Sequence, residues 1–325
     1  MKIQFLIPQY KETDEIIDPL LKSIEIQQGV DVKNDVGAII CNDGSDVKLT
    51  KEFLDSFPYD IQYIENDHKG VSATRNACLD AATADYVMFC DADDMFFNNC
   101  GLYIVFREML GKGFNALSST FIEETRDFKT GERVYINREM DTTFVHGKVY
   151  NRRYLLENSI RWNENLTIHE DSYFNCLAQK LAGDVKYSHM PFYLWRWRDE
   201  SVCRHDPKYI LKTYVNMLDS NTALVDEFIK RGRVFDAQYY ATAMIYDAYY
   251  MMNKDEWLNQ DNQEFRLKTE KRFKEYYTRF KPQFDSVSQE NKSQIIVGMK
   301  NRFFGEGMFM ESVTFSDWIN HIISL

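Results

Sequence analysis

The sequence predicts an α/β fold, in which a mostly parallel, doubly wound sheet is flanked by helices and followed by an all-helical region. Short apolar segments alternate with helical patterns through the first ninety or so residues, at the spacing of strand-helix-strand units. From about residue 207, apolar positions recur at helical spacing and no further strand is clearly indicated. We therefore expect an α/β catalytic domain over residues 1–206 and a helical region over residues 207–325.

Strands are expected at about residues 2–7, 36–41, 61–64 and 85–90. The first helix is expected to start at Asp18 and Pro19, an N-cap followed by proline at the first helical position. Further helices are expected near residues 48–57 and over residues 70–82. Beyond about residue 113 the pattern becomes irregular, with a hairpin expected around residues 129–132 and a helix over about 171–181.

The composition is that of a globular protein: 44% of the 325 residues are hydrophobic, and the formal net charge is −11. This charge argues against a nucleic-acid binder that uses its whole surface. No apolar run has the length of a bilayer-spanning helix, and the N-terminus has no signal-peptide pattern. We expect a cytoplasmic protein, with the inner face of the membrane as a second candidate location, and reduced core cysteines.

The most informative segment is the apolar strand that ends in Asp91, Ala92, Asp93 and Asp94. On an extended backbone, Asp91 and Asp93 would lie on one side and could approach one cation. Carboxylate oxygens favour Mg²⁺ or Mn²⁺, which commonly bind substrate phosphates as well. The implied substrate is a nucleotide diphosphate or triphosphate, and the alternative is a solvated Asp-rich turn.

Other polar residues follow the neighbouring strands at the edge where parallel sheets bind ligands. Tyr10 and Glu12 come after the first strand, and Asp43 after the second, where a carboxylate can accept hydrogen bonds from a nucleobase or ribose. Asp43 alone would more often form a turn. Gly70 opens a helix next to Lys69 and Arg75, where phosphates could be held, although Arg75 could instead brace the acidic turns.

In this order and spacing, four motifs strongly resemble family-2 glycosyltransferases of the GT-A fold, which has a Rossmann-like sheet. They are Pro8-x-Tyr10, Asn42-Asp43-Gly44-Ser45, Gly70-x-Ser72-x-x-Arg75-Asn76 and Phe89-Cys90-Asp91-Ala92-Asp93-Asp94. The resemblance covers about residues 1–200. It implies a nucleotide-sugar donor, with a UDP-sugar favoured, Mn²⁺ or Mg²⁺ on Asp91 and Asp93, and inversion at the anomeric carbon. The donor contacts it implies are Pro8, Tyr10, Glu12, Asp43, Lys69, Gly70, Arg75, Asp91 and Ala92.

Downstream, the stretch His146-Gly147-Lys148-Val149-Tyr150-Asn151-Arg152-Arg153 and the acidic pair Glu170-Asp171 also fit the resemblance. It implies that Asp171 is the general base that deprotonates the acceptor hydroxyl. The alternative is that the pair consists of ordinary acids at a helix N-terminus. Where the family often has a metal-site histidine, this chain has Arg198. Either Arg198 contacts the diphosphate, which we favour, or His205 takes the metal role.

The helical region carries a tyrosine-rich stretch over residues 235–252, predicted to be core or a homo-oligomer face, with a carbohydrate platform as the alternative. Residues 265–281 interleave basic and aromatic side chains; a solvated face is favoured over contact with a membrane or polyanion.

Two rival functions are a sugar nucleotidyltransferase and a catalytically silent binding module. The hydroxyl acceptor could be a glycan, a lipid-linked sugar, a protein or a modified base, and the sequence does not choose among them.

Overall fold

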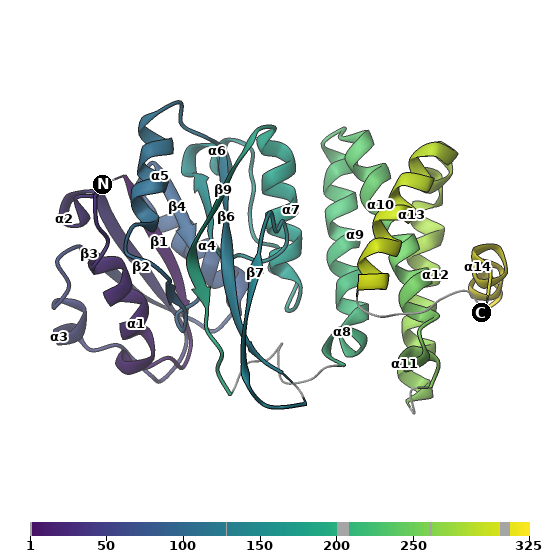
Figure 1. The fold of residues 1–325 in the computed structure, drawn as a ribbon, viewed down its shortest axis with the longest axis horizontal. Coiled ribbons are helices and arrows are strands. Elements are labelled where there is room, and N and C mark those ends of the chain that lie inside the picture. The colour runs from purple at the N-terminus through teal and green to yellow at the C-terminus, as the bar shows by residue number, and fades with distance from the viewer. Residues whose placement is uncertain (1, 128, 200–207, 260–261, 306–312) are drawn as a thin grey trace. The chain divides into compact units, whose positions relative to one another are not determined.

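The computed structural model describes residues 2–127, 129–199, 208–259, 262–305 and 313–325 (Figure 1). The chain divides into two compact units, Met1–Pro207 and Lys208–Leu325. The first contains all the described strands and the second contains only helices.

The described strands of the first unit form one sheet, whose parallel half has the order β3-β2-β1-β4. These strands are β1 (Ile3–Gln9), β2 (Val36–Asp43), β3 (Asp60–Asn66) and β4 (Tyr86–Phe89), close to the predicted ranges. The sheet continues from β4 through strands of mixed direction: β8 (Lys148–Asn151), β6 (Ala116–Arg126), β9 (Val185–Trp195) and β5 (Met95–Phe96), with β7 (Arg133–Arg138) paired to β6. The parallel half thus has the predicted topology.

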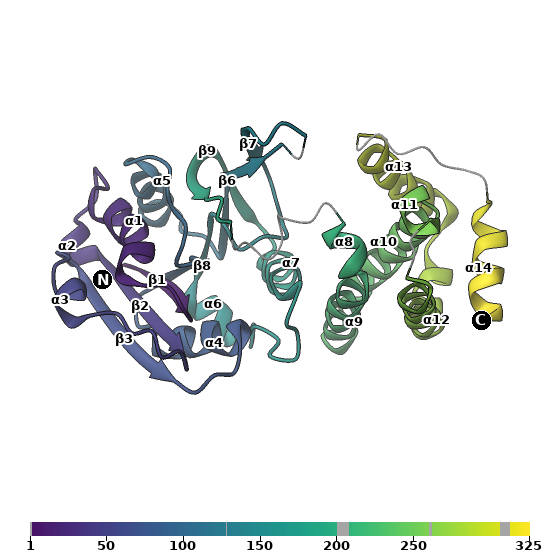
Figure 2. The same ribbon diagram turned by 90° about the horizontal axis from the view of Figure 1, so that it is seen from below.

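Helices cover both faces of the sheet, which explains why its inner strands are almost uniformly apolar. Figure 2 shows α1 (Asp14–Glu25) and α5 (Gly101–Leu110) on one side, and α4 (Val71–Ala81) and α6 (Arg152–Glu157) on the other. The remaining helices of this unit are α2 (Val32–Asp35), α3 (Lys51–Leu54) and α7 (Glu170–Ala182). Phe5 of β1 is buried in the core with Ile17 and Leu20 of α1.

Two predicted helix boundaries are wrong. Helix α1 begins at Asp14, after the N-cap residue Thr13, so Pro19 lies inside the helix rather than at its start. Burying the apolar face of α1 outweighs the single backbone hydrogen bond that a proline cannot donate. Helix α3 is a single turn capped by Thr50, and the chain then leaves helical geometry and buries Phe57 and Tyr59.

Two further predictions have mixed outcomes. Strands β6 and β7 pair antiparallel up to Arg126 and Arg133, and Gly131 has a φ of 73°, which confirms the hairpin. Among the described cysteines, Cys41, Cys78, Cys90 and Cys176 are buried, but Cys100 is exposed, so the prediction of a core cysteine is wrong there. Cys100 is the residue before α5 and faces solvent.

The second unit is helical wherever it is described, as predicted. Its helices are α8 (Tyr209–Lys212), α9 (Tyr214–Lys230), α10 (Val234–Met252), α11 (Asp255–Leu258), α12 (Gln263–Ser286), α13 (Gln289–Gly305) and α14 (Phe315–Ser324). Tyr246, Tyr249 and Tyr250 of α10 are buried, which supports the core interpretation of the tyrosine-rich stretch. Within the described ranges, no helix combines the length and apolar character needed to cross a membrane.

The basic side chains of α12 are partly neutralised inside this unit. Arg272 pairs with Asp219 of α9 at 2.7 Å, and Arg279 pairs with Asp226 at 2.8 Å. Lys281 pairs with Asp285 on α12 itself. These pairs support the interpretation of residues 265–281 as an ordinary solvated helix face.

Candidate active site

The site residues predicted at the ends of β1, β2 and β4 lie along one edge of the sheet. In the parallel half, Gln9 of β1 lies opposite Asn42 of β2, and Leu6 of β1 lies opposite Phe89 of β4. The segments that follow these strands are therefore neighbours. They carry Tyr10, Glu12 and the acidic segment 91–94, while Pro8 and Asp43 lie in the last residues of β1 and β2.

The Asp43 carboxylate organises the loop before α4. It accepts hydrogen bonds from the backbone N–H groups of Lys69 at 2.8 Å and Gly70 at 3.0 Å. Gly44 has a φ of +67°, and a Cβ there would lie 2.4 Å from the His68 backbone nitrogen, so this turn requires glycine. Asp43 is thus buried in the loop that it holds, while the Lys69 side chain is exposed.

Tyr10 and His68 form a stacked aromatic pair beside Asp43. Their ring centroids are 4.9 Å apart with an interplanar angle of 28°, and His68 Nδ1 lies 2.9 Å from Asp43 Oδ2. Tyr10 is exposed. A flat, accessible pair next to a carboxylate suits a nucleobase. Tyr10 was predicted from the sequence, whereas His68 was not, because it belongs to no recognisable motif.

The acidic segment is a turn, so the expectation of an extended backbone at Asp91 and Asp93 is wrong. The Asp94 backbone N–H donates to the Asp91 carbonyl at 3.2 Å. The reason is Asp94, whose buried carboxylate accepts hydrogen bonds from the Tyr193 hydroxyl at 2.8 Å and the Arg196 N–H at 2.9 Å. The Asp91 and Asp93 carboxylates nevertheless remain close: burial first, and then the charge of Asp91, raise the pKa of Asp93.

Arg198 lies against this turn. Its Nη1 atom is 3.1 Å from Asp93 Oδ2 and 3.8 Å from Glu12 Oε1. Glu12 is held in turn by the Tyr10 backbone N–H, which donates to its carboxylate at 2.8 Å. The structure therefore brings Arg198 together with the residues predicted to bind donor and metal. His205, the alternative to Arg198, lies outside the described residues.

Arg75 links the acidic turn to the acidic pair at the start of α7. Its buried guanidinium donates to Asp91 at 2.8 Å and to Glu170 at 2.9 Å, and its carbon Cζ lies 4.4 Å from the Trp162 ring centroid. Burial opposes the charge, but the Asp91 and Glu170 carboxylates raise the pKa of Arg75, so the guanidinium stays ionised. This geometry is the bracing alternative foreseen for Arg75, and its contact with a donor stays a prediction.

Helix α4 also fixes the loop that leads into α7. Asn76 accepts from the Trp162 N–H at 3.0 Å and donates to the Glu164 carboxylate at 2.9 Å. Trp162 stacks on Phe174 of α7, with centroids 4.2 Å apart and rings nearly parallel at 2°. Asn76 was not singled out for these contacts, because its partners Trp162 and Glu164 lie more than eighty residues further along the chain.

Asp171, the predicted base, is the second residue of α7 and is half-buried. Burial, followed by the neighbouring charge of Glu170, raises its pKa to about 7; the Arg75 charge and the Ser172 N–H oppose the rise. A general base works best when its pKa lies near the working pH. The arrangement therefore suits proton abstraction at neutral pH.

The described residues also bring together a group suited to a divalent cation: Asp91, Asp94 and His146, whose ligand atoms lie within 4.8 Å of one another. His146 is buried and stacks on Trp195 with centroids 4.7 Å apart, and its Nδ1 has no hydrogen-bond partner among the described residues. Burial lowers its pKa to about 3, so the imidazole is neutral, the form that binds metals. Oxygen and imidazole ligands fit a divalent cation such as Mn²⁺. In the sequence, His146 stands out only as part of the longer stretch from His146 to Arg153.

Two curated relatives share sequence with the chain. It is 28% identical over 235 residues to the glycosyltransferase GlyA of Streptococcus pneumoniae, covering 62% of this chain and 32% of GlyA. It is 22% identical over 197 residues to the poly(ribitol-phosphate) β-N-acetylglucosaminyltransferase TarS of Staphylococcus aureus, covering 57% of this chain and 34% of TarS. The matches thus span about a third of the length of each relative.

Among solved structures, the crystal structure of S. aureus TarS 1–349 in complex with UDP superposes with a TM-score of 0.64 at 14% identity, covering 97% of this chain and 94% of that one. The complex of TarS 1–349 with UDP-GlcNAc gives 0.54 at 16% identity, covering 92% and 79%. These similarities confirm the predicted GT-A fold. The profile of glycosyl transferase family 2 matches residues 5–171, more than half of the chain. The chain therefore belongs to glycosyl transferase family 2.

Proposed function

We propose that this protein is a metal-dependent, inverting glycosyltransferase that moves a sugar from a UDP-sugar to a hydroxyl acceptor. One observation carries the proposal: Arg75 joins Asp91 of the acidic turn to Glu170, the neighbour of Asp171. The groups proposed for the donor diphosphate and the group proposed for the acceptor proton are thereby held in a single site. The TarS complexes with UDP and UDP-GlcNAc support a uridine nucleotide as donor.

The proposed chemistry divides the site between its residues. Tyr10 and Asp43 bind the nucleobase end of the donor. Asp91 and Asp93 would hold a divalent cation, which supplies charge neutralisation for a leaving diphosphate. Asp94 and His146, which lie in one group with Asp91, are candidate further ligands. Arg198, already beside Asp93, adds a second positive charge that suits phosphate oxygens.

Asp171 is proposed to remove the proton of the acceptor hydroxyl as its oxygen attacks the anomeric carbon. The bond between that carbon and the diphosphate breaks in the same displacement, so a single base suffices and the anomeric configuration inverts. TarS supports a polymer with free hydroxyl groups as the acceptor, since its name gives poly(ribitol phosphate) as its substrate.

The proposal is tested by incubating the purified protein with UDP-, GDP-, CDP- and dTDP-sugars and Mn²⁺, with and without poly(ribitol phosphate), and measuring released nucleotide. We expect UDP from a UDP-sugar, with the transferred sugar bonded to the acceptor in the opposite anomeric configuration. A parallel incubation with UTP and a sugar 1-phosphate tests the rival enzyme, because release of pyrophosphate from that pair would indicate a sugar nucleotidyltransferase. Binding of UDP without turnover of any sugar nucleotide would favour a silent binding module.

A further inference from the structure

A buried lysine lies beside the proposed site and has no part in the chemistry above. Lys148 is in the centre of the sheet, on β8, and its side chain is 1% exposed. Its Nζ atom lies 3.3 Å from Asp141 Oδ1 and 3.4 Å from the His146 carbonyl oxygen. Burying an ammonium group is costly unless it is paired, so an apolar side chain would have been the simpler choice for this position.

The Lys148–Asp141 pair fixes the turn that begins at Asp141. The Asp141 carboxylate also accepts hydrogen bonds from the backbone N–H groups of Thr143 at 2.9 Å and Phe144 at 2.7 Å. Its carbonyl oxygen accepts from the Ser118 hydroxyl on β6 at 3.3 Å. The pair thus ties this turn to the two central strands β6 and β8.

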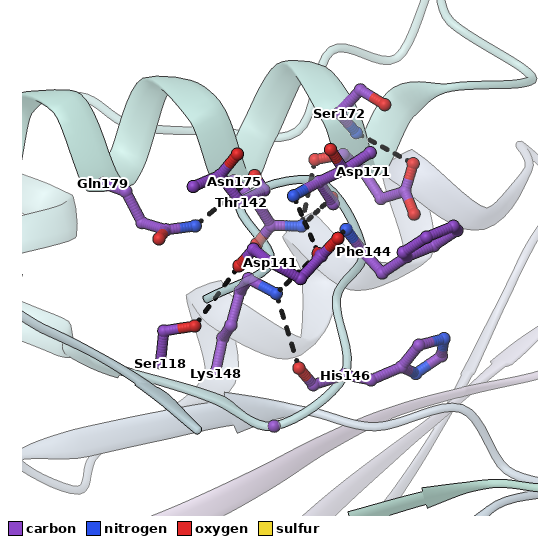
Figure 3. Close-up of polar contacts among 12 residues, drawn as sticks. Ser118, Asp141, Thr142, Phe144, His146, Lys148, Asp171, Ser172, Asn175 and Gln179 are labelled. Atoms are coloured by element: carbon purple, nitrogen blue, oxygen red, sulfur yellow. Dashed lines mark hydrogen bonds and ion pairs between the residues drawn. The ribbon is translucent and has the colours of Figure 1, made fainter. Parts of the chain in front are cut away.

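The same turn is bonded to the first turns of α7, as Figure 3 shows. Asn175, which is fully buried, donates to the Thr143 carbonyl at 2.8 Å and to the Asp171 carbonyl at 2.9 Å. A chain of polar contacts therefore runs from Lys148 through Asp141, Thr143 and Asn175 to the backbone of Asp171.

Lys148 and Asp171 also interact through their charges. Burial lowers the pKa of Lys148, while the carboxylates of Asp141 and, to a smaller extent, Asp171 act in the opposite direction. The other charges that act on Asp171 are Glu170 on α7, Arg75 on α4 and Asp91 after β4.

We propose that Lys148 is a positioning residue that holds the turn at Asp141 against α7 and so places the Asp171 carboxylate for proton abstraction. The inference rests on the proposed function, because it concerns the base of that reaction. Lys148 itself does not touch the substrate in this proposal. It acts through Asp141 and Asn175, and through its charge.

The test compares Lys148→Met with Asp141→Asn, because the two changes move the charge near Asp171 in opposite directions. Loss of the lysine charge should raise the apparent pKa of the ascending limb of kcat/KM against pH by about one unit. Asp141→Asn removes the negative charge and leaves the ammonium group without its carboxylate, so it should lower this apparent pKa. The amide oxygen of the new side chain can still accept the hydrogen bonds of the turn. A purely structural role would not move the two limbs in opposite directions.

Lys148→Arg keeps the positive charge, so the apparent pKa of the ascending limb should stay at the wild-type value. Lys2→Met is the control, since Lys2 also pairs with an aspartate, Asp35 at the end of α2, at 2.8 Å but far along the chain from α7. A second measurement needs no activity: hydrogen exchange of the amides of residues 141–147 and 170–176 should be about tenfold faster in Lys148→Met than in Lys2→Met.

The outcomes separate the two proposals. A wild-type protein that transfers no sugar overturns the proposed function and, with it, the role of Lys148. An active wild type whose Lys148→Met variant keeps both the pH profile and the exchange rates overturns the Lys148 proposal alone. Faster exchange with an unmoved pH profile in both variants shows that Lys148 stabilises the fold without positioning the base, and also overturns it.

Discussion

Asp171→Asn separates proton abstraction from every other role of the site. The change keeps the size of the side chain and an oxygen that can accept the Ser172 N–H, a contact of 2.8 Å in the native protein. Transfer should fall by roughly 10²–10⁴-fold, the usual contribution of a positioned general base. UDP affinity should stay at the wild-type value, because the proposed nucleotide contacts lie at Tyr10 and Asp43.

The raised pKa of Asp171 also predicts a stability effect of definite sign. A rise from the usual 3.8 to about 7 means that the folded state binds a proton more tightly than the unfolded chain between these two pH values. The wild type should therefore lose stability as the pH rises from about 4 to 7. The full shift corresponds to at most about 4 kcal/mol, and solvent access to this half-buried carboxylate reduces it.

We therefore expect the unfolding free energy of Asp171→Asn, relative to that of the wild type, to increase by about 1–2 kcal/mol as the pH rises from 5 to 8. Urea denaturation at both pH values measures this difference, and calorimetry with UDP and transfer assays measure the functional half. Asp184→Asn is the control, because Asp184 lies just after α7 with its side chain 85% exposed. Near-normal transfer with intact UDP binding would refute the assignment of the base.

Three other changes test the rest of the site. Asp93→Ala should abolish metal-dependent turnover of the donor, as EDTA should in the wild type; activity that survives either treatment contradicts the metal assignment. Asp43→Ala should weaken UDP binding by at least about tenfold in calorimetry, with kcat changed far less, and an unchanged affinity would reduce Asp43 to a turn former. Arg75→Met leaves the carboxylates of Asp91 and Glu170 without their buried partner and should cost about 3–5 kcal/mol in urea denaturation, whereas a loss below about 1 kcal/mol would show that the bridge is not structural.

The parallel half of the sheet and its ligand-binding edge could be predicted from local sequence. Each strand is a short apolar run, and the carboxyl ends of parallel strands share one edge, so the polar residues after β1, β2 and β4 had to be neighbours. The glycine requirement at Gly44 was also predictable, since a tight turn at positive φ follows from the Asn-Asp-Gly-Ser motif. These features depend on periodicity and turn chemistry within a few residues.

Contacts between distant segments could not be predicted in this way, and they decide the electrostatics of the site. The Arg75–Glu170 ion pair, the approach of His146 to Asp94 and the link from Lys148 to Asp171 each depend on how α7 and β8 pack against the parallel strands. The start of α1 at Asp14 has the same origin, because burial of its apolar face overrides the local signal of Pro19. Sequence by itself determined which residues meet at the sheet edge, whereas tertiary packing determined which charges are buried together, because desolvation depends on the whole surroundings of a group.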